Sequence, residues 1–145
     1  MDLRKSRFIL LVYLFIIPFT SYAGDFDGSN LLSGTVEKVL EITQFKVNED
    51  VDPDIVGLPR NFFIDIEGKT VVPSQESMIR TISKIKLIEH VENKIIFQGT
   101  DEGVDNIDDA LAWSIAISKK TGKVVLSASG DGVAYVVFGS CTVVY

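Results

Sequence analysis

Carboxylate side chains gather in two segments of this chain, and calcium binding is the first chemistry that they suggest. Asp50, Asp52 and Asp54 alternate in the first segment, as carboxylates do in loops that hold Ca²⁺ through oxygen ligands. An EF-hand loop that began at Asp50 would need glycine at its sixth position and glutamate at its twelfth. The chain has Ile55 and Asn61 there, so we predict a solvated acidic loop.

The second acidic segment holds Asp101, Glu102, Asp105, Asp108 and Asp109. A hard cation would relieve the repulsion among these carboxylates, and the candidate calcium ligands are Asp101, Asp105, Asp108 and Asp109. Their spacing follows no ordered ligand pattern, which favours a surface loop that allows one helical turn. Loop acids could also serve a hydrolase as paired carboxylates, provided that they converge in a cleft.

The single histidine, His90, and the single cysteine, Cys141, do not suffice for a zinc site, which needs several nitrogen or sulfur ligands. A nucleophilic Cys–His pair would require the two residues to meet in the fold, whereas His90 lies beside a turn and is predicted to be exposed. No His or Lys lies next to Cys141 in the sequence to favour the thiolate. We therefore expect a buried, unreacted thiol in a monomer, and the alternative is an exposed thiol that forms intermolecular disulfides.

Residues 111–118 alternate between large apolar and small side chains, which is the period of a half-buried strand. Trp113 lies on the large face and is predicted to pack in the core, with ligand stacking as the alternative. The small face would either admit another layer at close range or leave room for a ligand inside a barrel. The candidate ligand-binding residues are Trp113, Ser114, Ala116, Tyr135 and Phe138, of which the last two lie on opposite faces of their strand.

Strands and tight turns are predicted for most of the chain that would position these residues. Val36–Ile42 also fits helical spacing, but its β-branched residues favour a strand. Gly24–Asn30 is predicted to be a flexible lead-in. The predicted strand segments are 34–48 (one or two strands), 61–66, 70–72, 79–89, 94–98, 111–118, 124–129, 133–138 and 141–144, with turns at 67–69, 91–93, 119–122 and 129–132.

These segments predict an all-β, antiparallel meander of about eight strands. A meander hides its edges best by closing on itself, so a small barrel is favoured over a two-sheet sandwich.

The first 23 residues have the layout of a secretory signal peptide, with a basic start, an apolar run and small residues before a cut after Ala23. Residues 24–145 would then form a single soluble domain, periplasmic or secreted. That domain keeps 11 of the 14 basic and 19 of the 20 acidic side chains, a net charge of −8. This charge argues against binding to nucleic acid or to anionic lipid surfaces, and no later apolar stretch is long enough for stable membrane insertion.

The chain resembles a family of short exported proteobacterial proteins of uncharacterised function. The residues that carry the resemblance are Asp27-Gly28-Ser29 with Leu31-Leu32, Gly57-Leu58-Pro59, Ile96-Phe97-Gln98-Gly99, Ala112-Trp113-Ser114 with Ile117-Ser118, Thr121-Gly122-Lys123 and Val137-Phe138-Gly139-Ser140-Cys141-Thr142. The resemblance implies export and one β-rich domain, and it brings no activity or ligand. It also implies that relatives carry a cysteine where this chain has Ser33, so that a bridge from that position to Cys141 would be lost here.

The function predicted from these features is non-enzymatic binding of a small molecule or a protein partner, without a cofactor. A small exported hydrolase that uses loop carboxylates and a calcium-stabilised structural module are the alternatives.

Overall fold

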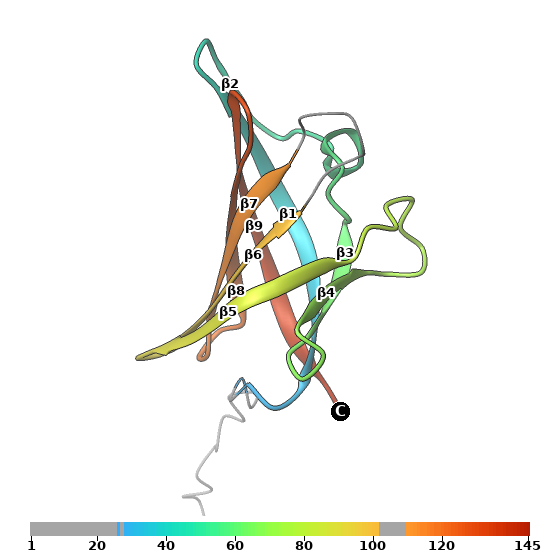
Figure 1. Cartoon of the computed structure of the whole chain (residues 1–145), viewed down its shortest axis with the longest axis vertical. Helices are drawn as coiled ribbons and strands as arrows, with labels where there is room; N and C mark the ends of the chain where they lie inside the picture. Colours follow the sequence, from blue (N-terminus) through green and yellow to red (C-terminus); the bar gives the residue numbers. More distant parts are fainter. Residues whose placement is uncertain (1–25, 27, 102–109) are drawn as a thin grey trace, which may run out of the picture.

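Nearly all of the described chain is β-strand in the computed structural model, which describes residues 26, 28–101 and 110–145. The strands wrap into a barrel, with the β1–β2 tip and the C-terminus at opposite ends (Figure 1). The strands are β1 Leu31–Thr43, β2 Val47–Asn48, β3 Asn61–Asp65, β4 Thr70–Pro73, β5 Ser83–Val91, β6 Lys94–Asp101, β7 Leu111–Ser118, β8 Lys123–Ser129 and β9 Val133–Val144. A 3₁₀ turn over Pro53–Val56 is the helical element among the described residues.

The barrel is closed by the pairing of β1 with β9. Neighbouring strands pair antiparallel in the order β2-β1-β3-β4-β5-β6-β7-β8-β9, and β1 also pairs with β9 along its whole length, from Leu31 opposite Val144 to Thr43 opposite Val133. Eight strands form the barrel and β2 is an additional strand on β1. The predicted all-β antiparallel barrel is therefore confirmed, and the two-sheet sandwich is wrong.

Period-two alternation decides which side chains enter the barrel. On β7, Trp113, Ile115 and Ile117 are buried, while Ala112, Ser114, Ala116 and Ser118 lie at intermediate or high exposure. The large face of this strand points inward, where it joins Ile95 and Phe97 of β6 in the core. Burial of such side chains removes apolar surface from water and is the main force that holds the sheet closed.

Turn residues fix the hairpins where the sequence predicted them. Gly122 in the β7–β8 turn has a φ of 67°, a left-handed conformation that glycine adopts without cost. In the β3–β4 turn, the backbone N–H of Gly68 donates to the Asp65 carboxylate at 2.8 Å. The hairpins β3–β4, β5–β6, β7–β8 and β8–β9 all follow predicted turns.

Several predicted boundaries are wrong, and β6 runs to Asp101 although its strand was predicted to end at Gln98. β1 begins at Leu31 rather than Gly34, and β5 begins at Ser83, so that residues 79–82 belong to the preceding loop. β9 is one continuous strand through Gly139, where a break was predicted. A Cβ atom at Gly139 would overlap the carbonyl oxygen of Thr35, so this glycine lets β9 pass close to β1.

The predicted flexible lead-in contains a core residue. Phe26 is only 8% exposed and belongs to the main hydrophobic cluster. Its ring lies 3.0 Å from where a Cβ atom of Gly122 would stand, beside the carbonyl oxygen of Cys141. The His90 ring of β5 lies 2.9 Å from where a Cβ atom of Gly28 would stand. This segment therefore packs against the barrel through Phe26 and Gly28.

Cys141 faces inward on β9 and is buried. It pairs with Gly34 of β1, whereas Ser33 pairs with Thr142 and is partly exposed. Adjacent residues of a strand point to opposite faces, so a cysteine at position 33 would face away from Cys141. The bridge implied by the family resemblance does not fit this register.

Phe26 and Cys141 belong to one hydrophobic cluster, so Phe26→Ala should loosen the packing around the Cys141 thiol and lower the free energy of unfolding by about 3 kcal/mol, the cost of removing a buried aromatic ring. Thiol labelling in native buffer should accelerate relative to the unmodified chain. Phe45→Ala is the matched control, because Phe45 is 86% exposed. Equal labelling rates in the two variants would contradict a contribution of Phe26 to the burial of the Cys141 thiol.

Burial raises the pKa of the Cys141 thiol from 9.0 to about 12, so the folded chain retains a proton that the unfolded chain releases above pH 9. The free energy of unfolding should therefore fall between pH 9 and 12. Cys141→Ala should show a shallower fall in denaturant titrations across the same range. Parallel curves, or a covalent dimer on non-reducing electrophoresis, would contradict a buried neutral thiol.

Candidate functional site

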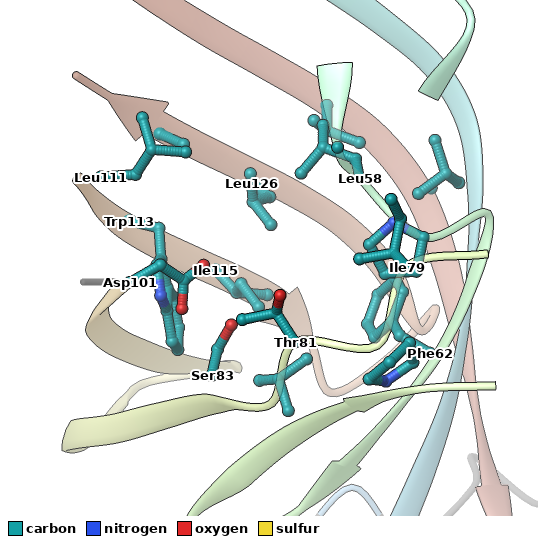
Figure 2. Close-up of a pocket in the computed structure, with 18 of the residues that line it drawn as sticks. Leu58, Phe62, Ile79, Thr81, Ser83, Asp101, Leu111, Trp113, Ile115 and Leu126 are labelled. Atoms are coloured by element: carbon teal, nitrogen blue, oxygen red, sulfur yellow. The ribbon is translucent and has the colours of Figure 1, made fainter. Parts of the chain in front are cut away.

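A cavity of about 90 Å³ lies inside the barrel and opens where the strands β3 and β4 are short. The loop that follows the 3₁₀ turn and the β4–β5 connection both contribute residues to its wall, among them Leu58 and Ile79 (Figure 2). The inner faces of the strands supply the rest. The strand residues with apolar side chains that line it are Val36, Phe62, Val71, Pro73, Leu111, Trp113, Ile115, Val124, Leu126, Ala128 and Val137.

The size of the cavity limits what it can hold. A cavity needs only about 10–15 Å³ to hold one water molecule, and an apolar engineered cavity of about 150 Å³ binds benzene. At about 90 Å³, the space inside this barrel fits a short alkyl group or part of a ring. Because it opens to solvent, a longer molecule could extend through the mouth.

Trp113 forms one side of the cavity because its ring lies on a glycine. Gly99 of β6 is its direct partner across the strand pair, and a Cβ atom at Gly99 would overlap Cζ2 of the indole. The indole Nε1–H is shielded from solvent and has no hydrogen-bond partner among residues 26, 28–101 and 110–145. An unpaired buried donor costs about 1–3 kcal/mol, so this N–H is an unusual feature that a bound acceptor would relieve.

Three polar side chains gather beside Trp113. Asp101 is the inward-facing residue two positions after Gly99, and it pairs with Leu111. Figure 2 shows the Asp101 carboxylate and the hydroxyls of Thr81 and Ser83 directed toward the same part of the cavity. Within the described part of the chain, none of these three side chains donates or accepts a hydrogen bond, so the polar side of the cavity is free to bind a ligand.

Two further glycines at inward positions let neighbouring groups approach their strands closely. Gly34 of β1 pairs with Phe62 of β3, and a Cβ atom there would overlap the Phe62 ring. Gly139 lines the cavity directly. Gly34, Gly99 and Gly139 were not predicted as site residues, although a glycine at an inward position of a strand, such as Gly99 after Ile95 and Phe97, is a signal of close packing against a backbone.

The five predicted ligand-binding residues do not share one space. Trp113 lines the cavity, and Tyr135 packs against the core without reaching it. Ser114 and Ala116 lie on the outer face of β7, and Phe138 is 40% exposed on the outer face of β9. The interpretation of the small face as the inside of the barrel is wrong, because the large side chains of β7 fill the interior.

Ion pairs account for the first acidic segment. Arg60 Nη2 lies 2.7 Å from Asp52 and Arg60 Nε lies 3.1 Å from Asp54, while Lys38 Nζ lies 3.5 Å from Asp50. Hydrogen bonding to Glu49, together with the charge of Asp50, raises the pKa of Lys38. These carboxylates hold the loop that carries Leu58 into the cavity wall.

The second acidic segment is only partly described. Asp101 lines the cavity, while Asp105, Asp108 and Asp109 lie outside the described residues, so the calcium site stays a prediction. Among residues 26, 28–101 and 110–145, no three His, Cys, Asp or Glu side chains are grouped so as to hold a metal ion. No helix formed by those residues is long and apolar enough to cross a membrane.

A nucleophilic pair of Cys141 and His90 is not formed. His90 is exposed on β5, as predicted. The Cys141 thiol is buried, and burial raises its pKa to about 12, which disfavours the thiolate that a nucleophile needs. Burial also raises the pKa of Tyr135, and the negative charge of Glu41 raises it further.

Gly99→Ala should displace the Trp113 ring and lower the free energy of unfolding by about 1–3 kcal/mol, as overpacking does in other cores. Trp113 is the only tryptophan, so its fluorescence should shift in the same variant. Ala112→Val enlarges a side chain on the outer face of β7, where Ala112 is exposed. It should leave the free energy of unfolding and the Trp113 fluorescence nearly unchanged. A stable Gly99→Ala variant with unaltered emission would contradict the ring–glycine contact.

Comparisons with protein-family models, with curated proteins and with solved structures gave no match for this chain.

Proposed function

We propose that this chain is an exported binding protein whose barrel holds a small apolar molecule, without catalysis. The observation that carries the proposal is the cavity inside the barrel, lined by apolar side chains from most of its strands. Ligand sites in proteins are typically concave and mostly apolar, with a few polar groups that orient the ligand. The side formed by Trp113, Asp101, Thr81 and Ser83 supplies such polar groups.

The small interior of an eight-stranded barrel supports a ligand of modest size. Such a barrel is just wide enough to be filled by its own side chains or to hold one small ligand. Here Gly34 and Gly99 let the rings of Phe62 and Trp113 lie close against their neighbouring strands, and part of the interior between the rings stays open. The apolar walls would exclude water from a hydrocarbon group, and burial of that group would contribute most of the affinity.

The distribution of carboxylates favours binding over hydrolysis. Two acids that converge in a cleft are the minimum for acid–base cleavage. Asp101 is the one carboxylate of the described residues that lines the apolar cavity. Asp52 and Asp54 are paired with Arg60 elsewhere, where they fix a loop.

The proposed export rests on the sequence of residues 1–23, which lie outside the described residues. An exported binding domain would meet apolar molecules outside the cytoplasm. The continuous β-sheet closure and the core need no disulfide, which agrees with the single free cysteine.

Ala128→Leu should fill the cavity and abolish binding of small apolar molecules. Ala128 lines the cavity and is 5% exposed, whereas its neighbour Ser127 is exposed on the outer face of β8. Ser127→Leu is therefore the matched control and should bind like the unmodified chain. Titrations of purified mature protein with a panel of small aromatic and aliphatic compounds, followed by Trp113 fluorescence and thermal shift, provide the measurement.

Compounds that bind the unmodified chain and the Ser127→Leu variant but not the Ala128→Leu variant would support the proposal. Circular dichroism and melting of each variant establish that it is folded. Ala128→Val, a smaller addition, should weaken binding partially if the larger residue prevents folding. Binding that survives in a folded Ala128→Leu variant, or no binding by any chain, would overturn the proposal.

A further inference from the structure

We propose that the cavity selects a hydroxyl-bearing apolar molecule and discriminates against carboxylates. This inference rests on the proposed function and specifies its ligand class. The observations that carry it are the unpartnered, buried Nε1–H of Trp113 and the carboxylate of Asp101 beside it.

Trp113 supplies a donor that no described residue satisfies. The indole is 8% exposed and its Nε1 atom is shielded from solvent. Indole nitrogen donates and never accepts. The ligand therefore needs an oxygen or other acceptor at this position, which a plain hydrocarbon lacks.

Asp101 supplies the complementary acceptor. Gly99 is the direct partner of Trp113 across β6 and β7, and Asp101 follows on the same inner face, so Asp101 and Trp113 are diagonal neighbours. Diagonal neighbours on one sheet face lie about 7–8 Å apart, within reach of an aromatic side chain, so one group bound between them could contact both. An ionised carboxylate accepts hydrogen bonds only, so the ligand must also donate.

A hydroxyl group meets both demands at one atom. Its oxygen accepts from Trp113 Nε1–H while its hydrogen is donated to Asp101, and the hydroxyls of Thr81 and Ser83 can adapt as donor or acceptor. Figure 2 shows these polar atoms on one side of the cavity and Leu58, Ile79 and Phe62 on the other. The apolar part of the ligand would lie among the latter residues and the inner strand faces.

The lining contains no positive charge to hold an anion. Lys, Arg and His are all absent from the described residues that line the cavity. A carboxylate bound there would lose its hydration opposite Asp101, with no counter-ion in return. The Asp101 carboxylate would therefore repel fatty-acid-like anions, while it orients an alcohol.

The experiment compares hexanol, hexyl methyl ether and hexanoate as ligands of the mature chain at neutral pH, by calorimetry. The alcohol should bind at least about tenfold more tightly than the carboxylate, because a site built to hydrogen-bond a hydroxyl rejects analogues that leave its groups unpaired. The ether accepts but does not donate, and should bind between the two or as weakly as the carboxylate.

Variants of single residues test which side chains produce the preference for the alcohol over the carboxylate. Asp101→Asn should reduce the ratio of hexanol affinity to hexanoate affinity several-fold, since an amide can also donate. Trp113→Phe should weaken the binding of hexanol and leave the binding of hexane-like probes such as hexyl chloride unaffected. Asp131→Asn, on an exposed turn, is the matched control and should leave the ratio unchanged.

Equal affinities for hexanol and hexanoate in the unmodified chain would overturn this inference while leaving an apolar binding site in place. An unchanged ratio in a folded Asp101→Asn variant would also overturn it. Failure of all three ligands, and of the wider apolar panel, would instead remove the proposed function itself.

Discussion

The stacking of aromatic rings on glycines is the constraint on which the interior of this barrel depends. Trp113 lies on Gly99 and Phe62 lies on Gly34, each across a strand pair. A side chain on either glycine would push a large ring toward the barrel axis. The glycines instead hold both rings near the wall, and the space left between them is the cavity.

The surface loop of residues 49–60 depends on a second set of contacts, which are polar. The backbone N–H of Val51 donates to Val39, and that of Val36 donates to Arg60, at 3.1 and 2.8 Å. Arg60 is also paired with Asp52 and Asp54. Exposed ion pairs stabilise a fold only slightly, so their role here is to position the loop. The first acidic segment, Asp50, Asp52 and Asp54, which suggested calcium binding, is thereby explained as structural.

The sequence was sufficient for the fold because period-two alternation and turn residues are local signals. The strand 111–118 and the glycine at position 122 behave as predicted. The site was not predictable in the same way. Alternation predicted that the large face of β7, with Trp113, packs in the core, but it left open whether the small face also borders a ligand. Asp101 was assigned to a loop because its inward position follows from pairing with Leu111. Phe26 was missed because an isolated aromatic residue in a polar segment has no periodicity.

The pairing of β1 with β9 joins the first barrel strand to the last. No closed sheet can exist until β9 has been synthesised, since β1 has no partner along that edge before then. Contacts between strands so distant in sequence form slowly, because a long loop must be closed before they are gained. The barrel would thus close only after β9, the last strand, has been synthesised. The same arrangement means that loss of β9 would free the edges of both β1 and β8, and exposed strand edges promote aggregation.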